Sequence, residues 1–96
     1  GGCSVKSEDF VFESKDRKMS ISAEVEGMSY TGRVFVDGSA IITHHFPPFV
    51  NSRDEKYAVY NGQTFRSVLR IIKGIGSTTA QIYVDVDEKR VAEFFF

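Results

Sequence analysis

Residues 19–26 read MSISAEVE, and this stretch decides the fold because its side chains alternate without a break. Serine and glutamate occupy one face, and the other face is apolar, formed by Met19, Ile21, Ala23 and Val25. Alternation with period two is the pattern of a β-strand that has one face in the core and one in water. The sequence therefore predicts a half-buried strand here, and the neighbouring segments are interpreted from it.

A second strand follows after Gly27. Its apolar side chains fall on even-numbered positions: Met28, Tyr30, Val34 and Val36. Gly32 lies on the same face without a side chain, which predicts a bulge or a close approach of backbone. Asp37-Gly38 then predicts a hairpin turn, because glycine adopts positive φ at little cost and aspartate bonds nearby amides.

The rest of the chain contains further short strands. Residues 40–46 form the returning strand, which Pro47-Pro48 ends, since proline cannot donate to a ladder. Residues 56–60 and 82–86 are predicted to form further strands, and a charged turn at 87–90 leads into a last strand at 91–96. The expected fold is mainly β (all-β or α+β): a small antiparallel meander or barrel-like sheet of about seven short strands, with at most one helix near 63–73.

The segment 63–73 carries two conflicting signals. Asn61-Gly62 before it is typical of a hairpin turn. However, Phe65, Val68, Leu69 and Ile72 have the i, i+3, i+4, i+7 spacing of a helical stripe, and basic residues take the other side. Gly74 is placed as a helix-ending glycine would be. We expect a helix, because a strand would put arginines on the same face as Val68.

Length and composition indicate one modest domain. The chain has 96 residues, 42% of them hydrophobic, with a net charge of −1 and a single cysteine, Cys3. We expect residues 1–7 to be a flexible N-terminal segment and 8–96 to be a single β-rich domain. No apolar run is long enough to span a membrane, so we expect a soluble intracellular protein.

The triple phenylalanine at 94–96 predicts an interaction surface. A strand with apolar side chains on both faces needs cover on both, from its own domain or from a second chain. If the cover is a second copy, we expect the interface to include these residues: Tyr30, Phe35, Val91, Phe94, Phe95 and Phe96.

No motif predicts catalysis, a cofactor or a metal site. His44 and His45 are adjacent, so on a strand their rings face opposite ways and cannot easily share one ion. Serine, histidine and aspartate all occur, yet none stands in a nucleophile-elbow context. We therefore expect a protein that is not an enzyme.

A nucleic-acid surface is the alternative. It would stack bases on tyrosines and contact phosphate through basic residues, from this set: Tyr57, Tyr60, Arg66, Arg70, Lys73 and Tyr83. The net charge of −1 argues against it, because nucleic-acid binders generally present a basic face.

Residues 19–36 resemble a known family. After the alternating strand come Glu26-Gly27-Met28-Ser29-Tyr30-Thr31-Gly32 and then the apolar run Val34-Phe35-Val36. This pattern resembles the C-terminal part of the REKLES domain, which follows the AT-rich interaction (ARID) domain in the dead-ringer and Bright family of transcription factors. The resemblance implies self-association and partner binding in a nuclear regulator whose DNA contact is made elsewhere.

The functional hypothesis is therefore a self-associating, homo-oligomerising interaction domain of a nuclear transcription regulator. Its edge strand and aromatic C-terminus would form the interface, because an edge strand already presents free N–H and C=O groups. Two alternatives stay open: a small β-barrel that binds nucleic acid, and a module that captures a partner's peptide by strand addition.

Overall fold

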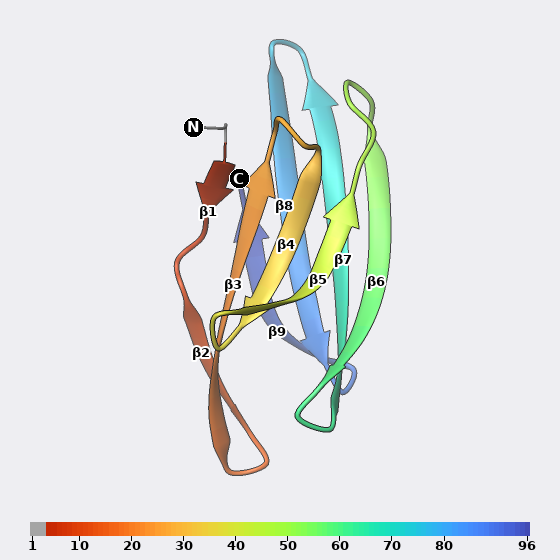
Figure 1. The fold of residues 1–96 in the computed structure, drawn as a ribbon. Helices are drawn as coiled ribbons and strands as arrows, with labels where there is room; N and C mark the ends of the chain where they lie inside the picture. Colours follow the sequence, from red (N-terminus) through yellow and green to blue (C-terminus); the bar gives the residue numbers. More distant parts are fainter. Residues whose placement is uncertain (1–3) are drawn as a thin grey trace.

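The chain is all-β in the computed structural model, which describes residues 4–96. Nine strands follow one another along the described residues (Figure 1). They are β1 (Ser4–Lys6), β2 (Phe10–Ser14), β3 (Arg17–Glu26), β4 (Thr31–Val36), β5 (Ser39–His45), β6 (Ser52–Tyr60), β7 (Gln63–Gly74), β8 (Ser77–Val86) and β9 (Lys89–Phe95). The mainly β, antiparallel prediction is confirmed, with nine strands in place of about seven.

The strands form two antiparallel sheets that pack face to face (Figure 1). The first sheet has the order β1-β3-β4-β5, and β2 also pairs with β3. The second sheet has the order β6-β7-β8-β9. Each is largely a meander, since successive strands joined by short hairpins become neighbours. The molecule measures 45 × 27 × 17 Å, as expected for two thin layers.

The core lies between the two sheets and follows the alternation of the sequence. Met19, Ile21 and Ala23 of β3 are buried, as residues 19–26 predict. Buried side chains from the other strands close the core: Val34, Val36, Ile42, Phe65, Leu69, Ile71, Ile82, Val84 and Phe94. Burial of this apolar surface is the main term that stabilises the sandwich.

Gly32 of β4 lies where the sheets approach closely, in agreement with its predicted role. A Cβ atom at this position would lie 3.3 Å from the side chains of both Ile82 and Leu69 of the second sheet. These contacts are tighter than ordinary van der Waals contact, so a larger side chain would push the layers apart.

We expect Gly32→Val to lower the free energy of unfolding by about 1–3 kcal/mol, the usual penalty for overpacking a core. Gly32→Ala is the matched control and should have a smaller effect, because the flexible ends of Ile82 and Leu69 can move slightly. Urea denaturation of both variants measures the difference. Equal stability of Gly32→Val and the wild type would contradict the close packing.

The prediction of a helix over 63–73 is wrong. Gln63–Gly74 instead form β7, a strand of 12 residues. Phe65, Leu69 and Ile71 face the core, while Arg66 and Arg70 alternate with them on the outer face. The apparent helical spacing arises because Val68 is apolar although it lies on the outer face. Val68 is buried on that face, where it lies opposite Glu55 and Tyr83 on the adjacent strands. Pairing on both sides of this central strand outweighs the local helical spacing.

Asn61-Gly62 forms the hairpin turn that its sequence predicts. Both residues have positive φ, 52° and 74°, which suits the primed turns that join twisted strands. This turn fixes the register of β6 against β7, with Tyr60 opposite Gln63.

The expected flexible segment 1–7 is in part a strand. Ser4–Lys6 pair with Glu24–Glu26 of β3, and the Ser7 amide donates to the Ala23 carbonyl at 2.8 Å. Residues 1–3, including Cys3, lie outside the described residues. Across residues 4–96 no helix could cross a bilayer.

Candidate functional site

β9 forms a free edge of the second sheet, since among residues 4–96 it pairs with β8 alone. Phe96 and Ala80 exchange both backbone hydrogen bonds, at 2.8 and 3.2 Å. Bonded and non-bonded pairs alternate along an antiparallel ladder, so the N–H and C=O groups of Glu93 and Phe95 point away from β8. The edge therefore presents backbone donors and acceptors to another strand.

The three terminal phenylalanines have three different environments. Phe94 is 4% exposed and belongs to the core, where its ring lies 5.4 Å from that of Phe10. Phe95 is 72% exposed on the outer face, and Phe96 is partly buried against the core. Only one of the three rings is thus held out to solvent, next to the free edge.

Two shallow hollows follow β9 on the side that faces β2. One, of about 340 Å³, includes Phe12 and Val91 in its lining. The other, of about 520 Å³, includes Phe10 and Phe95. Apolar side chains of the first sheet therefore border the free edge of the second.

The opposite edge of the second sheet, β6, is different in character. Its first half carries the charged run Arg53-Asp54-Glu55-Lys56. Charged side chains on an edge strand disfavour pairing with another chain. β9 also carries charge, at Lys89, Arg90 and Glu93, and differs from β6 in that its exposed Phe95 lies beside Phe10 of the first sheet.

The structure does not bring all the predicted interface residues together. Val91, Phe94, Phe95 and Phe96 belong to or directly follow β9, but Phe94 is buried. Phe35 lies on the first sheet, where the Lys6 ammonium is 5.0 Å from its ring centre. Tyr30 lies in the turn before β4, against Phe46.

A second candidate surface covers the outer face of β6–β9 and is occupied by a charge ladder, which we define as Glu55, Arg66, Asp85, Arg90 and Glu93. Arg66 lies 2.6 Å from Glu55 and 3.0 Å from Asp85. Arg90 lies 2.5 Å from Asp85 and 2.9 Å from Glu93. Each arginine is held between two carboxylates, so little positive charge is available to a phosphate.

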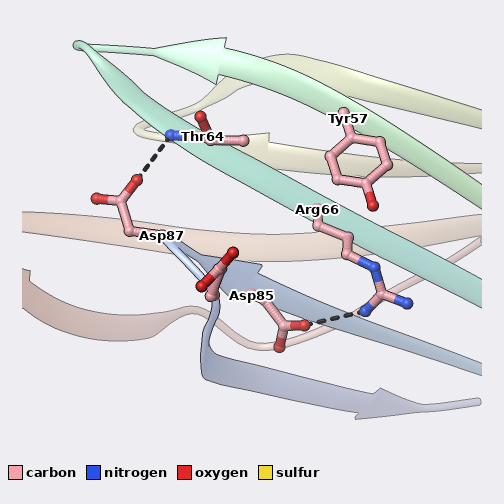
Figure 2. Close-up of a pocket in the computed structure, with 6 residues that line it drawn as sticks. Tyr57, Thr64, Arg66, Asp85 and Asp87 are labelled. Carbon is pink, nitrogen blue, oxygen red and sulfur yellow. Dashed lines mark hydrogen bonds and ion pairs between the residues drawn. The ribbon is translucent and has the colours of Figure 1, made fainter.

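A hollow of about 560 Å³ opens beside this ladder, lined by Tyr57, Thr64, Arg66, Asp85, Asp87 and Glu88 (Figure 2). Asp87 accepts a hydrogen bond from the Thr64 amide at 3.1 Å, shown as a dashed line in Figure 2. This bond, together with one from Gln63, lowers the pKa of Asp87. Asp87 therefore joins the β8–β9 turn to the start of β7.

The residues predicted to contact nucleic acid do not lie on one face of the molecule. Tyr57, Arg66, Arg70 and Tyr83 lie on the outer face of the second sheet, and the Arg90 guanidinium lies 4.0 Å from the Tyr83 ring centre. Tyr60 instead packs inward against Phe65, at 6.2 Å between ring centroids. Lys73 lies at the end of β7, 5.6 Å from the Phe49 ring centre.

A buried polar network joins the two sheets: His44 of β5, Asp54 of β6 and Ser67 of β7. His44 Nδ1 lies 2.7 Å from Asp54 Oδ2, and Nε2 lies 2.8 Å from Ser67 Oγ. A carboxylate can only accept, so Nδ1–H donates to Asp54 and Nε2 accepts from the serine hydroxyl. Burial lowers the pKa of His44 below 6.5, although the bond to Asp54 acts in the opposite direction.

Ser67, His44 and Asp54 are hydrogen-bonded in the order of a hydrolytic triad, but a substrate cannot reach the serine. His44 and Ser67 are both 0% exposed, and a nucleophile must reach its substrate. The network therefore stabilises the junction of the sheets. Its sequence signal is Ser67, a polar residue at an inward position between Phe65 and Leu69. His45, the neighbour of His44, is exposed, as expected of adjacent strand residues.

Among residues 4–96 no group of three or more His, Cys, Asp or Glu side chains could hold a metal ion. Comparison of the chain with family models, with curated proteins and with solved structures finds no match.

Proposed function

We propose that this chain is a self-associating interaction domain that pairs through the free edge of β9. The observation that carries the proposal is Phe95, a large aromatic residue 72% exposed beside outward-pointing backbone groups. Single exposed apolar residues are common on protein surfaces, but aromatic residues are enriched at interfaces, and Phe95 borders a second exposed ring, Phe10.

The simplest assembly places β9 antiparallel to β9 of a second copy across a two-fold axis. The backbone groups of Glu93 and Phe95 would complete a ladder, and Phe95 and Phe10 would lose exposure to water. The nuclear, transcription-regulatory setting is part of the same proposal and is supported by the resemblance of residues 19–36 alone.

Nucleic acid and a partner's peptide are the two other candidate ligands for these surfaces. The charge ladder counts against nucleic acid, because Arg66 and Arg90 are already paired with carboxylates. Capture of a partner's strand would use the same edge as self-association. A wild-type chain that stays monomeric at all concentrations would leave strand capture in place of self-association.

Phe95→Ala is expected to weaken self-association about 30-fold or more, as loss of an interface aromatic commonly does. Phe49→Ala is the matched control, because Phe49 is 75% exposed and lies in the β5–β6 loop, outside the two hollows that follow β9. Sedimentation equilibrium of both variants, read against the 10.8 kDa monomer mass, measures the change. Equal weakening by the two substitutions would contradict an interface at β9.

Glu93→Pro tests the backbone pairing itself. Its amide points away from β8, so proline should remove an edge donor without breaking the intramolecular ladder. We expect a folded protein with the monomer mass. A folded variant that associates like the wild type would show that β9 does not pair through its backbone.

A further inference from the structure

A separate apolar groove opens at the end of the sandwich that holds the β7–β8 hairpin and the β5–β6 loop. This end groove has a volume of about 320 Å³. Its lining is mostly aromatic, aliphatic and proline side chains: Val5, Val25, Gly27, Tyr30, Phe46, Pro47, Pro48, Phe49, Ile71, Lys73, Thr78, Ala80 and Phe96. Pockets for small molecules typically measure about 300–1,000 Å³ and have this apolar character.

The loop that covers the groove is fixed at both ends. The Phe46 amide donates to the Tyr30 carbonyl at 3.0 Å, which ties the start of the loop to the β3–β4 turn. The Asn51 side chain accepts from the Lys73 amide at 2.7 Å, which ties its end to β7. Pro47-Pro48 restrict the backbone between these points. The groove is therefore preformed, which reduces the entropy lost when a ligand binds.

Two of the groove aromatics have an unusual backbone. Tyr30 and Phe49 have φ values of 53° and 65°, in the left-handed region that bulky residues rarely adopt. Their rings contact each other edge to face, with centroids 6.5 Å apart. Such strained conformations cluster at ligand sites, where the surrounding structure holds them in place.

The charge of the groove selects the kind of ligand. Lys73 is the one Lys, Arg, Asp or Glu side chain among the described residues that line it. Its ammonium lies 5.6 Å from the Phe49 ring centre, at the exposed rim. The site thus combines an apolar interior with a single cation, which complements a molecule with an apolar chain and one negative end.

We propose that the end groove binds a medium-chain alkyl carboxylate, with its chain along the apolar surface that Tyr30, Phe46 and Phe49 form together and its carboxylate at Lys73. The groove includes Phe96, which follows β9, but not Glu93 or Phe95, whose backbone groups form the free edge.

The test is a calorimetric titration of the full chain with dodecanoate and with dodecanol, each below its aggregation concentration. We expect saturable one-to-one binding of dodecanoate. Lys73→Met should weaken dodecanoate binding about two- to fivefold, the range for an exposed ion pair, and leave dodecanol binding unchanged. Thr78→Trp, which fills the groove from β8, should abolish the binding of both probes.

Retained ¹⁵N–¹H amide spectra verify that each variant is folded, and shifts at Tyr30 and Phe46 locate the ligand. Absence of saturable binding would overturn the proposal. So would an equal effect of Lys73→Met on both probes, or full binding by folded Thr78→Trp. Lys73→Met and Thr78→Trp leave the residues of β9 unchanged. A failure to bind dodecanoate can therefore be distinguished from a failure to self-associate.

Discussion

Replacing Phe94 by alanine is expected to lower the free energy of unfolding by about 3–5 kcal/mol, the range for truncating a buried phenylalanine. The same substitution at Phe95 should leave the stability of the monomer nearly unchanged. Phe94 is 4% exposed and packs on Phe10, whereas Phe95 is 72% exposed. The two positions are adjacent in sequence and identical in chemistry, so they form a matched pair.

Urea denaturation at a concentration well below that of self-association measures this difference. Low concentration matters because association stabilises the folded state by mass action. If Phe95→Ala unfolded as readily as Phe94→Ala, then Phe95 would belong to the core and the free edge would lose its exposed aromatic residue.

Removing the imidazole of His44 is also expected to lower the free energy of unfolding strongly. His44→Ala would leave a cavity and deprive Ser67 and Asp54 of their partner, at about 2–5 kcal/mol of stability. His45→Ala is the control, because His45 is exposed on the opposite face of the same strand. His45→Ala should change the free energy of unfolding by no more than about 0.5 kcal/mol.

The same residue predicts how stability changes with pH. Burial lowers the pKa of His44 below 6.5 in the folded state, so the unfolded chain binds the proton more readily. The stability from neutral His44 is thus fully present above pH 6.5 and is lost as pH falls toward the lower, folded pKa. Asp54 opposes this lowering, whereas Lys56 and His45 add to it.

Denaturant unfolding between pH 7.5 and 5 checks this dependence in the wild type and in His44→Gln, which keeps a polar side chain without titrating. We expect the decline below pH 6.5 to be reduced in His44→Gln and retained in His45→Gln. Identical pH profiles for His44→Gln and the wild type would show that His44 does not supply the dependence.

The β-rich fold could be predicted because alternation is a local signal. Met19, Ile21 and Ala23 are buried as their spacing indicates, and Asp37-Gly38 turns the chain where expected. Segment 63–73 was not predictable in this way. Val68 is apolar on the outer face, so the strand has lost its simple alternation, and only pairing with β6 and β8 identifies it.

The candidate sites depend on tertiary contacts that sequence spacing does not contain. The C-terminal phenylalanines were recognisable as unusual, but which ring is exposed follows from the register of β9 on β8. Likewise, Arg66 and Arg70 appear as a basic cluster until Glu55 and Asp85 are placed beside Arg66. His44, Asp54 and Ser67 come from three strands and meet only in the folded sandwich.

Amide hydrogen exchange at several protein concentrations tests edge pairing most directly. The amides of Glu93 and Phe95 point away from β8, whereas that of Phe96 is bonded to Ala80. We expect protection of Glu93 and Phe95 to rise with protein concentration while Phe96 stays protected throughout. Fast exchange of Glu93 and Phe95 at every concentration would contradict pairing of β9 with a second copy.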